Sequence, residues 1–186
     1  MTIPFHITLP GTILAIVRTV LGADEDAELR SRFNGLMKRY SPVIDRICFG
    51  YAHTAADLQD LKQDAMLNIW LSLPGFNGDC AVQTWIYRVT LNSCVSTLRR
   101  TYRTPATVRL TDLYDAIDCD SERKEVLADI HDAVALLSPL DKAVVMLWLE
   151  GEAYEEIADI TGLTKSNVAV RIHRAKNRLK QHFNNE

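Results

Sequence analysis

The chain has 186 residues, of which 47% are apolar and 24% are charged, and its formal net charge is −3. This length suits one ordinary domain or two small ones, and the composition excludes a mainly disordered chain. The net charge excludes a uniformly basic nucleic-acid binder. The charge is nevertheless segregated, because acids dominate residues 111–137 whereas residues 161–185 contain none.

Residues 1–25 are predicted to be an N-terminal extension, to which we assign no role. The apolar stretch from Ile13 to Leu21 contains Arg18 and is too short to span a bilayer. It also lacks the positive charge that precedes the apolar core of a secretory signal. The four cysteines are widely spaced, with no CxxC pair and no histidine at zinc-ligand spacing. We therefore expect reduced thiols, no metal site, no cofactor and a cytoplasmic location.

The first half of the chain has helical periodicity throughout. Apolar residues between Phe33 and Tyr40 form one stripe, and Ser41-Pro42 is expected to open a second helix, since proline is tolerated in a first turn. A third helix is predicted from Asp57 to Leu73 and a fourth from about Ala81 to Tyr102. Pro74-Gly75 ends the third helix and begins the loop between them.

The third helix carries two carboxylates one turn apart, Asp60 and Asp64, beside Gln63 and Leu67. Such a pair could act as general acid and base, bind a metal ion, or form a docking surface for a basic partner. No further ligand or nucleophile stands near it in the sequence. A solvated helix face is the simplest interpretation, a docking surface is the next, and catalysis is the least favoured.

The fourth helix combines aromatic and cationic side chains. Trp85 is expected to belong partly to the core. Arg88, Asn92, Arg99 and Arg103 are separated by steps close to whole helical turns, so they form a strip that could follow a phosphate backbone. With aromatic residues interleaved, the strip could also hold the unstacked bases of a single strand.

Residues 138–180 are predicted to form three short helices with breaks at Gly151 and Gly162, which is the pattern of a helix-turn-helix. Gly162 permits the left-handed conformation that ends a helix, and Thr164 can cap the helix that follows. That last helix has an apolar face for the core, made of Val168, Ile172, Ala175 and Leu179.

The neighbouring face of the last helix is basic. Taken alone, a run of charges is usually a solvated face, but the capped frame of three helices favours DNA binding. Arginine and asparagine can recognise base edges in the major groove, and lysine can neutralise phosphate. The predicted DNA-binding residues are Lys165, Asn167, Arg171, Arg174, Lys176 and Arg178.

The predicted fold is therefore all-α. Two small helical domains, residues 26–103 and 122–186, are joined by an acidic linker at residues 104–121.

In this order the motifs resemble those of the bacterial extracytoplasmic-function sigma factors, over about Arg32 to Leu179. Asp60 to Trp70 is similar to the helix that docks on the clamp of the polymerase β′ subunit. Phe76 to Asn92 is similar to the loop and helix that open and recognise the minus-10 element. Tyr154 to Ala175 is similar to the helix-turn-helix that recognises the minus-35 element.

The resemblance implies a sigma region 2 bundle and a sigma region 4 helix-turn-helix. It implies binding to core RNA polymerase, at the β′ clamp and the β flap, and to promoter DNA, with an anti-sigma factor as a further partner and no small-molecule substrate. The protein would direct promoter-specific transcription initiation and would not be an enzyme. The implied contacts are Asp60, Gln63, Asp64 and Leu67 for core polymerase; Asn77, Trp85, Arg88, Asn92, Arg99 and Arg103 for minus-10 DNA; and the six residues of the last helix for minus-35 DNA.

Four positions depart from the family's pattern: Val82, Ser96, Ala153 and Ala169. Val82 and Ser96 affect the base preference at minus-10 and leave docking intact. Ala153 removes a hydroxyl from a helix cap, which should cost about 1 kcal/mol.

Two other functions fit parts of the sequence. A helix-turn-helix regulator would use its first half as a sensor or dimerisation domain, but it would not need the motifs between Asp57 and Asn92. An all-helical enzyme would use Asp60 and Asp64, but the chain offers it no third ligand and no phosphate-binding glycine loop.

Overall fold

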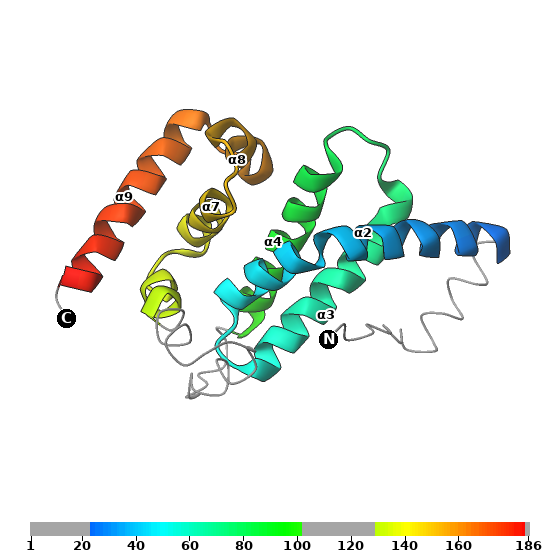
Figure 1. Cartoon of the computed structure of the whole chain (residues 1–186), viewed down its shortest axis with the longest axis horizontal. Coiled ribbons are helices and arrows are strands. Elements are labelled where there is room, and N and C mark those ends of the chain that lie inside the picture. The colour runs from blue at the N-terminus through cyan, green and yellow to red at the C-terminus, as the bar shows by residue number, and fades with distance from the viewer. Residues whose placement is uncertain (1–22, 102–128, 185–186) are drawn as a thin grey trace. The chain divides into compact units, whose positions relative to one another are not determined.

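The computed structural model describes residues 23–101 and 129–184, and the regular elements of these residues are all helices (Figure 1). The all-α prediction is confirmed for this part of the chain. The elements are α2 (Ala23–Tyr51), α3 (Ala55–Ser72), the 3-10 turn η1 (Leu73–Gly75), α4 (Val82–Thr101), a helical segment at 129–135, α7 (Pro139–Leu149), α8 (Tyr154–Thr161) and α9 (Lys165–Asn184). The N-terminal extension up to residue 22, the acidic linker and Arg103 lie outside the described residues.

The helix α2 corrects one prediction from the sequence. Ser41-Pro42 was expected to open a new helix, but α2 runs without a break through Pro42. Proline lacks the N–H that would donate to the carbonyl of residue 38, and its ring crowds that carbonyl, but the burial of side chains on both sides of Pro42 outweighs this cost. Tyr40, Val43 and Ile44 are all buried, so the apolar face continues across the proline. The described residues up to Arg39 and the described residues from Tyr40 onward belong to two different compact units.

Within the second unit, α3 and α4 pack along each other. Thr54 caps α3, because its hydroxyl oxygen accepts a hydrogen bond from the Asp57 N–H at 2.9 Å. Asn68 of α3 donates to the Ser93 hydroxyl of α4 at 2.8 Å. The apolar face of α3 is buried, as predicted, and consists of Leu58, Leu61, Ala65, Ile69 and Trp70.

A cysteine pair lies in the core between α2 and α4. The sulfur atoms of Cys48 and Cys94 are 3.9 Å apart, and neither side chain is exposed. The hydrogen bond to Cys48, together with burial, raises the pKa of the Cys94 thiol well above its usual value. Cys48, Cys80 and Cys94 are free thiols.

The three helices α7, α8 and α9 pack together as the sequence predicts. Gly162 ends α8 with a φ of 72°, and Gly151 follows α7 with a φ of 87°, so both breaks use the left-handed conformation that glycine adopts readily. Ser138 caps α7 ahead of Pro139. The predicted inward side chains Val168, Ile172 and Ala175 of α9 are buried.

In the helical segment at 129–135, Ile130 is 42% exposed, whereas His131 is only 4% exposed. The buried side of this short helix is centred on His131 and Val134, which are three residues apart and therefore share a face. Ile130 lies off that face.

Candidate nucleic-acid interface

Local hydrogen bonds fix the first turn of α9. The Thr164 hydroxyl accepts from the Asn167 N–H at 3.3 Å, which confirms the predicted cap. At the start of α8, the Glu156 carboxylate accepts from the Ala153 N–H at 3.1 Å. Ala153 has no side-chain acceptor to return the interaction, so only half of a capping box is present.

The six predicted DNA-binding residues of α9 lie on its outer side, where only Arg171 is half-buried and the other five are exposed. Three of the six contact other side chains of the helix-turn-helix. Lys165 forms an ion pair with Glu155, and both side chains are 62% exposed. The Lys176 ammonium lies 4.1 Å from the centre of the Trp148 ring. This is a cation–π contact that leaves the ammonium at the surface.

The third contact holds Arg171 against α7. Arg171 donates to the Asp141 carboxylate at 2.5 Å, and Ser138 donates to the same carboxylate at 2.7 Å. Burial opposes the charged form of Asp141, but these two hydrogen bonds outweigh it and hold the pKa below its usual value. Asn167, Arg174 and Arg178 are the remaining exposed members of the set.

The loop before α4 places two aromatic rings together. Phe76 and Trp85 are stacked, with ring centroids 4.7 Å apart and an angle of 25° between the planes. Asn77 follows Phe76 and is exposed. Gly78 has a φ of 86°, which turns the chain back toward α4. Sequence reasoning placed Trp85 partly in the core and missed its partner, although both rings flank the same short loop.

Two predicted residues of α4 lie beside a groove. Arg88 is half-buried and Asn92 is exposed, one turn apart on the helix. The groove has a volume of 440 Å³ and is lined by α4, α7 and the end of α8, with Leu91, Leu140 and Ile160 among its apolar residues. Arg99 lies in the last turn of α4.

The carboxylate face of α3 has the geometry that the sequence predicts. Asp60 and Gln63 are exposed, whereas Asp64 and Leu67 are half-buried. Asp64 accepts a hydrogen bond from the Thr97 hydroxyl of α4 at 3.0 Å, so it also connects the two helices. Among residues 23–101 and 129–184, no group of three histidine, cysteine or carboxylate side chains is placed to hold a metal ion.

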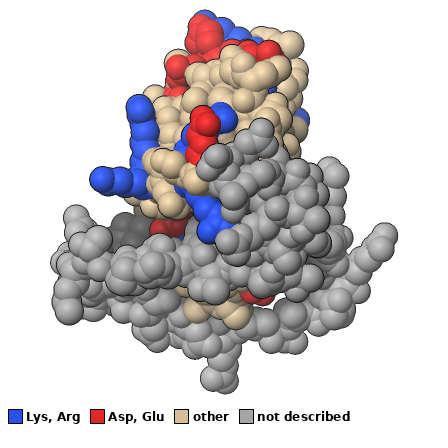
Figure 2. Space-filling model, turned by 90° about the vertical axis from the view of Figure 1, so that its right-hand side faces the viewer, with Lys and Arg blue, Asp and Glu red and all other residues tan. Residues whose placement is uncertain are grey.

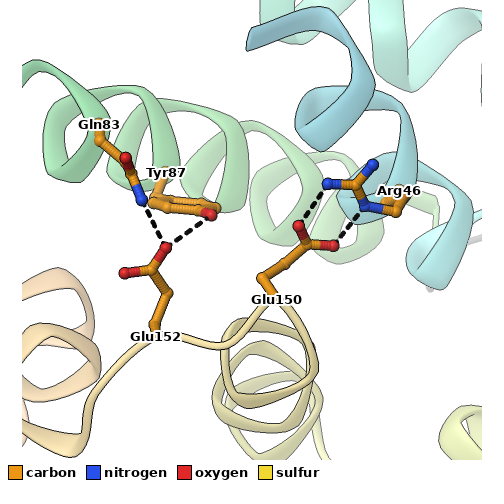
Figure 3. Close-up of polar contacts among 5 residues, drawn as sticks. All are labelled: Arg46, Gln83, Tyr87, Glu150 and Glu152. Atoms are coloured by element: carbon orange, nitrogen blue, oxygen red, sulfur yellow. Dashed lines mark hydrogen bonds and ion pairs between the residues drawn. The ribbon is translucent and has the colours of Figure 1, made fainter.

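A polar network that sequence reasoning missed connects α2 and α4 to the residues after α7 (Figure 3). Arg46 donates from Nε and Nη2 to the two carboxylate oxygens of Glu150, each at 2.5 Å. Gln83 and Tyr87 both donate to one oxygen of Glu152, at 2.5 and 2.9 Å. The partners are more than 60 positions apart in the chain, as the separations of 104, 69 and 65 residues attest, so no local pattern could predict them.

Three members of the network, Arg46, Tyr87 and Glu152, have shifted pKa values. The hydrogen bond from Arg46 to Glu150 raises the pKa of the guanidinium. Burial, followed by the hydrogen bond to Glu152, raises the pKa of Tyr87. Burial and the neighbouring Glu156 raise the pKa of the Glu152 carboxyl, although the bonds from Tyr87 and Gln83 oppose this.

On the face drawn in Figure 2, acidic and basic side chains lie side by side. None of the described helices is long and apolar enough to cross a membrane.

Comparison with known proteins assigns both halves of the chain. The model of sigma-70 region 2 matches residues 36–104, and the model of sigma-70 region 4 matches residues 127–179. The ECF RNA polymerase sigma factor SigM of Mycobacterium tuberculosis is 29% identical over 150 residues, which cover 81% of this chain and 76% of SigM. The ECF RNA polymerase sigma-E factor of Escherichia coli is 28% identical over 162 residues, which cover 77% of this chain and 82% of the relative.

Solved structures have the same fold. CnrH in complex with the cytosolic domain of CnrY matches with a TM-score of 0.65 and 21% identity, covering 84% of this chain and 90% of that chain. The sigma factor RpoE of Bartonella quintana, in complex with the anti-sigma factor NepR, matches with a TM-score of 0.63 and 20% identity, covering 82% and 97%.

An all-helical chain with sigma regions 2 and 4 in this order is a promoter-recognition subunit of bacterial RNA polymerase. The chain belongs to the extracytoplasmic-function family of these sigma factors. It binds core RNA polymerase and promoter DNA and directs promoter-specific transcription initiation. The interpretation as a simple helix-turn-helix regulator is wrong, because sigma region 2 accounts for residues 36–104.

Proposed function

We propose that three helices of this sigma factor each bind a different partner. The outer face of α3 docks on the β′ clamp of core polymerase, α4 with its preceding loop binds the melted minus-10 strand, and α9 binds the minus-35 duplex. One observation carries the proposal. Each of these helices has exposed polar side chains, is capped or packed against a neighbouring helix, and lies in a segment that matches sigma region 2 or 4. The proposed domains are residues 26–103 and 122–186, with 104–121 as the linker and the β flap as the docking site of the second domain.

The stacked pair of Phe76 and Trp85 supports the proposed minus-10 site. A ring already held in place offers a stacking surface for an unpaired base without further loss of side-chain freedom. Asn77 is exposed beside the pair and can hydrogen-bond a base edge. Arg88, Asn92 and Arg99 follow along α4, and with Arg103 they would contact the backbone of the strand.

The contacts within the helix-turn-helix suggest a division among the cations of α9. Arg174 and Arg178 are exposed and, with Asn167, are proposed to contact base edges. Arg171 is held by Asp141, so it is proposed to contact the DNA at a fixed position. Lys165 and Lys176 are proposed to neutralise phosphates, which fixes the register of the helix on the duplex.

An anti-sigma factor is the proposed regulator, and the cytoplasm is the proposed location. Both solved relatives are complexes with a partner, which for RpoE is named as an anti-sigma factor. The proposed activity is binding alone, with no catalytic residue, no cofactor and no small-molecule substrate.

A run-off transcription assay with purified core polymerase tests the docking face. Reversing Asp60 and Asp64 to lysine should abolish core binding and transcript formation, because two positive charges would then face the basic partner surface that two negative charges are proposed to meet. Glu28→Lys, at an exposed position of α2, is the control and should retain both. Circular dichroism should find the double variant folded, and unchanged affinity for core would contradict the proposal.

A further inference from the structure

An exposed apolar side chain, Val170, lies in the second turn of α9. Val170 is 47% exposed, whereas Val168 and Ile172 on either side of it are 0% and 1% exposed. Two residues correspond to about 200° of rotation in an α-helix, so the side chain of Val170 is directed away from both buried neighbours. It therefore lies on the side of α9 that faces away from the core of the helix-turn-helix.

Val170 shares its face of α9 with two of the proposed base-contacting residues. The inner side of α9 packs on α7 and α8 (Figure 1). On the outer side, Asn167 stands three residues before Val170 and Arg174 stands four residues after it, and both are exposed. Residues three and four apart lie on one face of a helix. The valine is therefore placed between two polar groups that are proposed to reach base edges.

The fold gains little from a valine at this position. A β-branched side chain loses rotational freedom in a helix, so valine favours the helix less than alanine does. Burial offsets this loss for Val168, whereas about half of the Val170 side chain stays in contact with water. A single exposed valine is common on protein surfaces. The position of Val170 on the proposed DNA-binding face is what distinguishes it from such a residue.

Neighbouring cations are held at the edges of this face. Arg171 donates to the Asp141 carboxylate of α7, and the Lys176 ammonium lies over the ring of Trp148, also in α7. Both contacts direct the charged groups toward α7 and away from the side chain of Val170. The centre of the outer face is therefore apolar and is flanked by charge.

We propose that Val170 contacts the methyl group of a thymine in the minus-35 duplex and thereby selects that base. In the major groove, thymine differs from the other bases in carrying a C5-methyl group, which an apolar side chain can contact. Asn167 and Arg174 would hydrogen-bond the neighbouring base pairs on either side. This contact rests on the proposed role of α9 at the minus-35 element, and it names one chemical feature of the DNA that α9 binds.

The expected size of the effect follows from the apolar surface that the contact removes from water. Burying one methyl group between the base and the valine changes an affinity by about three- to tenfold. This is smaller than the effect of a strong hydrogen-bonded base contact, so the methyl contact sets a preference at one base pair and does not determine the affinity for the whole element.

The experiment compares thymine with deoxyuridine, which lacks only the methyl group. Holoenzyme assembled from core polymerase and the full chain first selects duplexes from a library with a randomised minus-35 element. Each thymine of a selected duplex is then replaced by deoxyuridine, one position at a time. The wild type should lose about three- to tenfold in affinity at one position. Val170→Ala should bind the thymine and deoxyuridine duplexes of that position equally, and replacements elsewhere should affect both proteins alike.

Two further variants serve as controls. Val170→Thr keeps the shape of the side chain and one of its methyl groups, so it should retain part of the discrimination. Gln181→Ala, at an exposed position of the same helix, should retain all of it. Thermal unfolding of Val170→Ala should match that of the wild type, because the valine is not packed in the core. A wild type that binds deoxyuridine as tightly as thymine at every position would overturn the proposal, and so would an equal loss in the wild type and Val170→Ala.

The methyl contact and the proposed role of α9 fail in different ways. If Arg174→Ala leaves the affinity for every selected duplex unchanged, the proposed role of α9 at the minus-35 element is wrong. If Arg174→Ala weakens binding but no thymine is distinguished from deoxyuridine through Val170, only the methyl contact is wrong.

Discussion

The basic residues of α9 and α4 have similar patterns in the sequence but different surroundings in the structure. On α9, Lys165, Arg171 and Lys176 contact side chains of their own helix-turn-helix. On α4, Arg88 contacts α8, which lies 71 positions further along the chain. Local contacts orient the residues of α9 and leave them at the surface, whereas the contact of Arg88 occupies N–H groups of its guanidinium with the carbonyl of a residue in another helix.

The largest expected effect comes from α7, the helix that packs on both α8 and α9. Leu147 of α7 is completely buried, and α7 packs on both α8 and α9. Leu147→Ala should lower the free energy of unfolding by about 2–5 kcal/mol, because it leaves a cavity in the centre of the helix-turn-helix. Thermal unfolding measures the loss. A loss below about 1 kcal/mol would mean that the packing of α7 is not what stabilises the helix-turn-helix.

A substitution on the exposed face of α9 tests the proposed base contacts. Arg174→Ala should weaken binding to the minus-35 duplex by about 1–3 kcal/mol and relax the preference at one base pair. Affinity measured on a panel of duplexes gives both quantities, with Gln181→Ala as the exposed control on the same helix. An equal loss on every duplex would assign Arg174 to the phosphate backbone.

The contact of Arg171 with α7 can be separated from contact with DNA. Asp141→Asn removes the charge that holds Arg171, and it should cost about 1 kcal/mol of folding stability. The variant should also bind the minus-35 duplex less tightly, since Arg171 would lose its fixed position. Unchanged affinity together with reduced stability would restrict Asp141 to a structural role.

A smaller effect is expected from pH at the junction of α2 with the helix-turn-helix. Burial lowers the pKa of His131, whose ring packs on Phe49 and which faces Lys142 and Asp132. The unfolded chain therefore binds more protons than the folded chain below the ordinary histidine pKa of about 6.5. The stability due to neutral His131 is fully present above that pH and is lost as the pH falls below it.

The matched variant for this effect is His131→Gln, which keeps an N–H donor for the Ala52 carbonyl but does not titrate. As the pH falls from 7.5 to 5, the midpoint of unfolding should decrease less steeply in the variant than in the wild type. The difference in slope should correspond to the uptake of at most one proton. Identical slopes would show that His131 does not control the pH response.

Helical periodicity was enough to predict α3, α4, α7, α8 and α9, because each has apolar residues at helical spacing, and four of them have a capping residue or a terminal glycine. It failed at Pro42, because packing of Val43 and Ile44 outweighs one missing hydrogen bond. The exposed residues of α3 and α9 were also predictable, since they lie on the faces opposite the buried ones.

The hydrogen-bond partners of Arg46, Tyr87 and Arg88 could not be predicted from the sequence. Each partner is distant in the sequence: Arg46 binds Glu150, Tyr87 binds Glu152, and Arg88 binds the Asp159 carbonyl. Every residue has a backbone carbonyl, so the type of residue does not indicate which carbonyl accepts a hydrogen bond. The packing of the helix-turn-helix against α2 and α4 brings them together.

The most direct test of the difference between α4 and α9 is to measure minus-10 single-strand binding by this sigma factor with and without core polymerase. The free chain should bind at least about tenfold more weakly than the holoenzyme, because Arg88 donates to the Asp159 carbonyl in the free chain. The variant with Glu150→Gln and Glu152→Gln, which lacks the carboxylates that bind α2 and α4, should close much of that gap without core. Equal affinity of the free chain and the holoenzyme would contradict the account, because Arg88 would then be available to DNA from the start.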